Sequence, residues 1–169
     1  MTVRDLERLY DYGYWVNRRL FPIVTQLTTE EFTRAVAGSY GSVRNTMVHT
    51  LSAEWGWMDR CGGPARGPAL KADDFPDPQS VVSTWTRVEE QMRAFLSTLS
   101  DADISRPIQF TLPGQPACVM ALGELLHHGA NHGVHHRGQV ALLLRQLGKT
   151  PGNFDLLFYY AEKPLVAHA

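Results

Sequence analysis

Apolar residues recur at helical spacing in four long segments of the chain, with polar and charged residues between them. The segments are residues 3–25, 42–60, 78–99 and 120–147. Apolar positions three and four residues apart share one face of an α-helix, so each segment predicts an amphipathic helix. Four such helices in a chain of 169 residues predict an all-α protein with its core inside a four-helix bundle.

Residues at the expected helix ends support these boundaries. Ser42 can cap the second helix, and Asp77 can cap the third, which has Pro78 in its first turn. Gly148 suits the position that follows the fourth helix, and Pro151 prevents that helix from continuing. Capping chemistry and periodicity therefore predict the same boundaries.

The segments between the long helices differ in composition. Residues 28–42 show no long periodic stretch and predict a connection. Residues 61–77 are rich in glycine and proline, which cannot continue a helix, so they predict a long loop. Within residues 104–120, apolar and polar residues alternate ahead of a Pro-Gly turn signal at 113–114, which predicts a short β-hairpin or extended excursion. A short last helix is expected at residues 154–161.

Composition and charge narrow the class of protein. The length and the 44% hydrophobic content fit one globular domain over residues 1–169. The 16 basic and 17 acidic residues leave no basic surplus for nucleic acid or an anionic membrane. No apolar run resembles a secretory signal or a membrane span, and Cys61 and Cys118 form no CxxC motif. We therefore expect a cytoplasmic protein with two free thiols that binds neither nucleic acid nor membrane.

Histidines carry the clearest chemical signal in the chain. Five of the seven lie in one stretch of ten residues inside the fourth predicted helix, namely His127, His128, His132, His135 and His136. Residues four apart lie one above the other on a helix, so His132 and His136 can present two imidazole nitrogens to one metal ion. A third ligand in a bundle comes from a facing helix, and His49 is the only histidine on another long predicted helix.

Three imidazole ligands would leave coordination positions open to water or substrate, which is typical of catalytic metal sites. Imidazole suits zinc, nickel, copper or iron, and the sequence does not choose among them. The alternatives are a hydrogen-bonded core histidine at His49 and an ordinary polar helix face for the cluster. Gly133 stands where an HExxH metalloprotease has its catalytic glutamate, which argues against that class.

Four glycines lie in the same predicted helix: Gly123, Gly129, Gly133 and Gly138. Each costs up to about 1 kcal/mol relative to alanine inside a helix. Close approach of a neighbouring element, or room around a metal, would explain them. The alternative is that tertiary packing simply tolerates them.

Residues 132–139 read HGVHHRGQ, which resembles the HxxxHRGQ motif of the DinB/YfiT-like family. Three other features are similar to the same family: the single histidine in MVHTL, the opening LYDYGYWVNRRL, and the ending GKTP followed by FYY. The resemblance covers nearly the whole chain. It implies an up-down-down-up four-helix bundle, a homodimer and a divalent metal. By motif position the ligands are His49, His132 and His136, and whether His128 or His135 replaces one of them stays open.

The resemblance also implies an activity, because family members with an assigned one are mostly thiol-dependent transferases or isomerases. We therefore expect a metal-dependent transferase that joins a low-molecular-weight thiol to a small-molecule electrophile, the metal lowering the pKa of the thiol. Zinc or nickel is the expected metal, with iron, manganese or copper as alternatives. Arg137 and Gln139 would orient the site or pack the helix.

Two other functions stay open. The first is metal-assisted hydrolysis, which needs a general base; Glu54 and Glu124 qualify only if their helix faces point inward. The second is a metal-binding stress-response protein without turnover. Trp55 and Trp57 could line the mouth of a pocket, although packing is the expected role for at least one of them.

Overall fold

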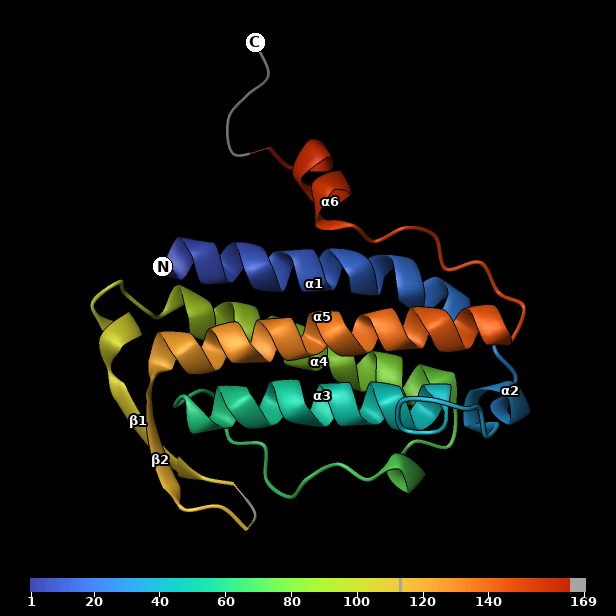
Figure 1. Ribbon diagram of the computed structural model, residues 1–169, viewed down its shortest axis with the longest axis horizontal. Helices are drawn as coiled ribbons and strands as arrows, with labels where there is room; N and C mark the ends of the chain where they lie inside the picture. Colours follow the sequence, from blue (N-terminus) through green and yellow to red (C-terminus); the bar gives the residue numbers. More distant parts are fainter. Residues whose placement is uncertain (113, 165–169) are drawn as a thin grey trace.

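Four long helices form a bundle in the computed structural model, which describes residues 1–112 and 114–164 (Figure 1). They are α1 (Val3–Val24), α3 (Val43–Arg60), α4 (Pro78–Ser97) and α5 (Leu122–Gln146). Each predicted boundary lies within two residues of the observed one. The predicted all-α four-helix bundle is therefore confirmed.

The order of helix directions is up-down-down-up, as expected. In Figure 1, α1 and α5 run in one direction, and α3 and α4 run in the other. Because α3 and α4 are consecutive yet parallel, the chain between them must return along the full length of the bundle. Residues 61–77 make this return as a long loop, which contains a single short 3-10 helix, η1 (Ala72–Asp74).

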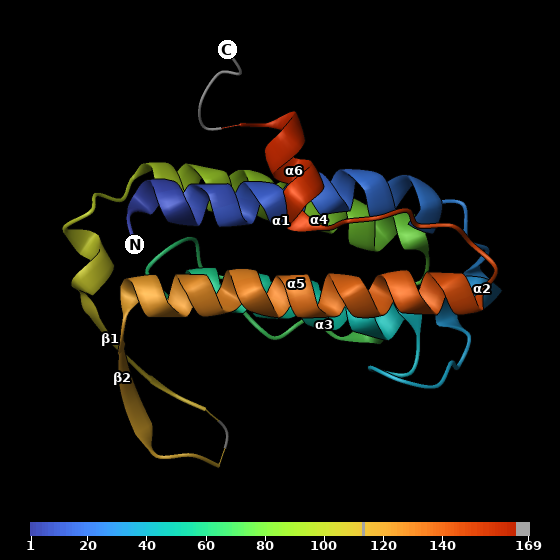
Figure 2. The ribbon, with the colours of Figure 1, turned by 45° about the horizontal axis from the view of Figure 1, so that its top comes forward.

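The core lies between two pairs of helices. Helices α1 and α3 each pack against both α4 and α5, and Figure 2 shows α1 beside α4 above α5 beside α3. Large side chains from all four helices are fully buried in this space: Leu6, Tyr14, Met47, Leu51, Trp85, Met92, Leu122 and Leu125. Within residues 1–112 and 114–164, none of the helices combines the length and apolar character that a membrane span requires.

Side chains cap the helices where the sequence placed the boundaries. The hydroxyl of Ser42 accepts a hydrogen bond from the backbone N–H of Asn45 at 3.0 Å. The carboxylate of Asp77 accepts one from the backbone N–H of Ser80 at 2.8 Å. Gly148 has a φ of 75°, the left-handed conformation in which glycine ends a helix without steric cost.

Two short helices differ from the prediction. The connection at residues 28–42 contains α2 (Thr29–Thr33), which begins at a capping box between Thr28 and Glu31 and buries Phe32 completely. Five residues are too few to show a periodic pattern, so the prediction of a plain connection was wrong there. The last helix, α6 (Leu156–Glu162), begins two residues later than predicted, because the Asp155 side chain caps it.

The predicted β-hairpin is confirmed and extends from the end of the bundle where α5 begins (Figure 1). Its strands are β1 (Pro107–Thr111) and β2 (Ala117–Ala121), which pair antiparallel. The predicted turn includes Pro113, which lies outside the described residues. On the inner side, the buried ring of Phe110 packs edge-on against Trp57, with ring centroids 5.7 Å apart. The hairpin thereby supports a tryptophan on the side of α3 that carries the candidate site.

Three of the four glycines in α5 permit close packing. A Cβ at Gly123, Gly129 or Gly133 would collide with another side chain, whereas a Cβ at Gly138 would meet nothing within 4 Å. A Cβ at Gly129 would lie 2.7 Å from the hydroxyl oxygen of Tyr10, in α1. Close approach of a neighbouring element therefore explains Gly123 and Gly129. Gly133 makes room for the Arg137 side chain of the same helix, and Gly138 is tolerated.

Candidate metal centre

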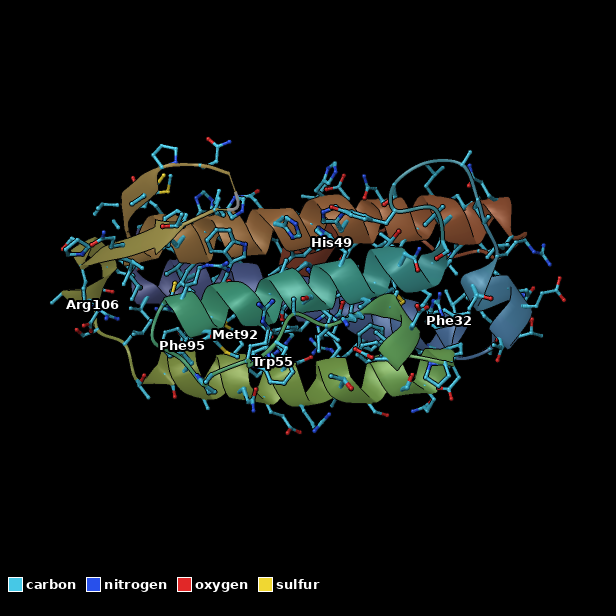
Figure 3. The ribbon with its side chains drawn as sticks, turned by 90° about the horizontal axis from the view of Figure 1, so that it is seen from below. Phe32, His49, Trp55, Met92, Phe95 and Arg106 are labelled. Carbon is cyan, nitrogen blue, oxygen red and sulfur yellow. The ribbon has the colours of Figure 1, made fainter. Side chains whose placement is uncertain are left out.

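The three histidines that the sequence singled out meet where α3 packs against α5. His49 comes from α3, and Figure 3 shows it at the border with α5; His132 and His136 lie one turn apart on α5. Over the described part of the chain, they are the one group of three or more potential ligand side chains whose ligand atoms all lie within 4.8 Å of one another. His128 and His135 are exposed and do not belong to this group.

The separations between ring nitrogens suit a single metal ion. His132 Nε2 lies 3.1 Å from His49 Nε2 and 3.1 Å from His136 Nε2. Two imidazole nitrogens that are each about 2.0–2.1 Å from one metal, at angles between a right angle and the tetrahedral angle, are about 2.9–3.4 Å apart. The three side chains could therefore hold a divalent metal with little movement.

A hydrogen bond donated to Gln139 fixes the proton of His136. The Gln139 carbonyl oxygen lies 2.6 Å from His136 Nδ1 and can only accept, so Nδ1 carries the proton and Nε2 keeps its lone pair. The rest of the Gln139 amide agrees with this orientation, because its oxygen also accepts from the Ser39 hydroxyl at 2.6 Å and its nitrogen contacts His135 Nε2 at 3.0 Å. Metal-binding histidines are commonly oriented by such an outer partner.

The Nε2 atoms of the three histidines cannot all be paired by hydrogen bonds to one another. A nitrogen of a neutral imidazole is either a donor or an acceptor, and His136 Nε2 is an acceptor. Burial lowers the pKa of His49 and His136, and burial together with the neighbouring histidines lowers the pKa of His132 to about 4. The rings are therefore neutral at pH 7, and a cation at their centre would engage all three lone pairs.

The turn before α3 places Tyr40 over the histidines. The Tyr40 hydroxyl lies 2.9 Å from His49 Nε2, and the two rings stack with centroids 3.9 Å apart. Gly38 and Gly41 have φ values of 99° and 84°, which let the chain fold back tightly on either side of this residue. No sequence pattern predicted Tyr40 or Ser39 at the site. The paired glycines signal a turn, but they do not show which helices the turn approaches.

The carboxylates considered as general bases do not reach the site. Glu54 is buried on the core side of α3, where it accepts hydrogen bonds from Tyr14 at 2.9 Å, Trp85 at 3.2 Å and Arg137 at 3.3 Å. Glu124 caps the start of α5 by accepting from the backbone N–H of Ala121. Neither helix face points into the candidate centre, so neither residue can activate water there.

A cavity of about 280 Å³ opens beside the centre. His49, His132 and Trp57 line it together with Ser52, Ala53, Arg60, Arg66 and His128. Trp57 therefore lines the pocket as expected, whereas Trp55 lies on the α4 side of α3 (Figure 3) and packs against the core. A larger cavity of about 380 Å³, around Asp11 and Arg93, contains no histidine.

Replacing Gln139 with leucine is expected to weaken zinc binding by roughly 10–100-fold, the usual cost of removing an outer hydrogen-bond partner from a ligand. The reason is that His136 would lose the acceptor that holds its proton on Nδ1. Competition with a chromophoric chelator measures the affinity. Gln146→Leu, at the exposed end of α5, is the matched control. Equal affinities in the two variants would show that Gln139 does not orient the centre.

The chain is similar to proteins of one known family along nearly its whole length. Residues 1–164 match the DinB family. Protein DinB of Bacillus subtilis (strain 168) is 24% identical over 164 residues, which is 92% of this chain and 94% of that protein. YizA of the same strain is 25% identical over 144 residues, which is 85% of this chain and 89% of that protein.

Solved structures share the fold. A DinB-like protein from Bacillus cereus ATCC 10987 superposes with a TM-score of 0.74 at 19% identity, covering 90% of this chain and 97% of that one. YfiT from Bacillus subtilis superposes with a TM-score of 0.63 at 20% identity, covering 86% and 89%. YfiT is described as a probable metal-dependent hydrolase with an unusual four-helix bundle topology.

Proposed function

The chain belongs to the DinB family, and we propose that it is a metal-dependent enzyme that transfers a low-molecular-weight thiol to a small-molecule electrophile. His49, His132 and His136 are the proposed ligands. The observation that carries the proposal is the convergence of their three Nε2 atoms beside a cavity that His49 and His132 line. A divalent metal, zinc or nickel in our proposal, would supply a Lewis acid that lowers the pKa of a thiol.

The surrounding side chains have distinct roles in this proposal. Gln139 keeps the proton of His136 on Nδ1, so that Nε2 faces the centre. Tyr40 covers one side of His49 with its ring and restricts access from that direction. Trp57, supported by Phe110, forms an apolar wall against which a small electrophile can pack. Substrates would therefore enter from the side of the cavity.

The lining of the cavity favours thiol transfer over hydrolysis. Among the described residues that line it, there is no carboxylate to serve as a general base. A metal lowers the pKa of a bound water to about 7, and hydrolysis then gains from a positioned base. A coordinated thiol is deprotonated outright and needs no base. Metal-dependent hydrolysis remains the second candidate, because YfiT, which shares the fold, is described as a probable metal-dependent hydrolase.

Turnover assays on zinc-loaded and nickel-loaded protein test the proposal. Cysteine and glutathione serve as thiols with 1-chloro-2,4-dinitrobenzene as the electrophile, and p-nitrophenyl acetate without thiol tests hydrolysis. We expect thioether formation that falls at least about 100-fold in His132→Ala, a size common for loss of a catalytic group. Ester hydrolysis alone would favour the second candidate. Metal binding without either activity would favour a protein that binds metal and has no turnover.

A further inference from the structure

The cavity beside the histidines carries positive charge that nothing in it balances. Arg60 ends α3 and Arg66 lies in the loop after it, and both line the cavity. Neither guanidinium has a carboxylate oxygen within 4.0 Å in the part of the chain that the structure describes. Asp59 is the acidic residue next to Arg60 in sequence, and among the described residues its carboxylate accepts only from the backbone N–H of Arg66.

The two guanidinium groups converge over Gly56. A Cβ on this residue would lie 2.9 Å from Arg66 Nη1 and 3.4 Å from Arg60 Nη1. A side chain at position 56 would therefore displace the guanidinium of Arg66. Two like charges in one cavity repel each other, although water screens the exposed Arg60, so the pair favours the approach of an anion.

Arg66 is held in place and still has an unused donor. Its Nη1 donates to the backbone oxygen of Ser52 at 2.9 Å and to the Ser52 hydroxyl at 3.1 Å. Its Nε is buried and makes no hydrogen bond within the described structure. The guanidinium of Arg60 lies over the ring of Trp57, 4.9 Å from the centroid. Both groups are thus positioned before any ligand arrives.

We propose that Arg60 and Arg66 bind the carboxylate or phosphate group of a small-molecule substrate. Guanidinium groups pair with such oxyanions through two parallel hydrogen bonds, and a cavity of about 280 Å³ admits only a small molecule. The same cavity reaches His49 and His132, so the other end of the molecule can approach the centre. That this anion is the substrate rests on the proposed function, whereas the binding of an anion does not.

The larger cavity around Asp11 does not offer a comparable site. There two of the four basic side chains already have a carboxylate partner, because Asp11 pairs with Arg93 at 2.8 Å and with Lys163 at 3.3 Å. The Tyr159 hydroxyl donates to the same carboxylate at 2.9 Å. Two carboxylates, Glu7 and Asp11, line that larger cavity, whereas none is among the described residues that line the smaller one, which leaves the arginine pair as the stronger candidate for recognition of an anion.

Calorimetric titration of the chelator-treated, metal-free protein tests the proposal. The probes are succinate, inorganic phosphate and the neutral analogue succinamide, in Tris chloride at constant ionic strength. We expect binding of succinate or phosphate and none of succinamide. The anion that binds more tightly identifies the group that the arginines prefer. Equal binding of succinamide, or no binding of either anion, would overturn the proposal.

Three variants identify the residues responsible. Arg60→Gln, at an exposed position where loss of folding is not expected, and Arg66→Gln should each weaken anion binding by about tenfold, the effect of one charge-assisted hydrogen bond. Arg87→Gln, an exposed arginine on α4, should leave it unchanged. If Arg60→Gln and Arg66→Gln bind the anion as wild type does, the proposal is wrong.

The metal and the anion can be tested separately. His132→Ala should still bind the anion, because the arginine pair does not depend on the histidines. Arg60→Gln should still bind zinc. If the wild-type protein binds zinc but neither anion, only the arginine proposal is refuted. If it binds an anion but neither zinc nor nickel, only the metal centre is refuted.

Discussion

Substitution of His132 by alanine is expected to lower bound zinc from about one ion per chain to less than about one-tenth after dialysis. His132 Nε2 is the nitrogen that lies 3.1 Å from each of the other two, so its loss removes the middle donor. Two donors rarely make a stable site, and the loss should exceed the roughly 10–100-fold expected on removal of an outer partner. Elemental analysis of protein purified without chelator measures the content.

His127→Ala is the matched control for this experiment, because His127 lies exposed on the same helix and belongs to no ligand group. It should retain the metal content of the wild type. Full occupancy in His132→Ala would contradict the three-histidine centre. Absence of metal from the wild type, even after zinc or nickel is added back, would do so as well.

Substitution of Glu54 by alanine is expected to lower the free energy of unfolding by about 3–5 kcal/mol, the usual cost of breaking a buried ion pair. The Glu54 and Arg137 side chains are only 4% and 6% exposed. Alanine would leave the guanidinium without its carboxylate, and the Tyr14 hydroxyl and Trp85 ring N–H would lose their acceptor. Urea denaturation measures the change.

Glu30→Ala provides the comparison, since it breaks an ion pair with Arg34 on the surface. Its effect should stay within about 1 kcal/mol, as for exposed pairs in general. If Glu54→Ala cost no more than Glu30→Ala, the buried network would not be a main support of the bundle. The folded fraction of Glu54→Ala should still bind zinc, because Glu54 does not reach the histidines.

Most of the fold could be predicted because its determinants are local. The rows of apolar residues on α1, α3, α4 and α5 are long enough to show a helical period. The side chains of Ser42 and Asp77 mark the starts of α3 and α4. The parallel direction of α3 and α4 was predicted from the family resemblance. Two consecutive parallel helices require a long connection, and residues 61–77 provide it. Helix α2 was missed because its stability comes from one buried phenylalanine and a capping box, which give no period.

The sequence predicted the three histidines of the candidate site, but it did not predict the residues that surround them. A spacing of four places His132 and His136 together on any helix. His49 followed as the only histidine on another long predicted helix, and the resemblance agreed with that choice. Tyr40 and Arg66 come from loops, where the fold alone decides which helix they approach. Glu54 could not be assigned from sequence, because an acidic residue beside an apolar stripe looks the same whether it faces a site or the core. The expected homodimer and thiol cosubstrate stay predictions.

The central claim, that one metal ion binds His49, His132 and His136 together, is tested most directly by anomalous diffraction from crystals grown with one equivalent of zinc. We predict one anomalous peak per chain, about 2.0–2.1 Å from the Nε2 atom of each histidine. No peak between α3 and α5, or a peak held instead by the exposed histidines of α5, would contradict the account.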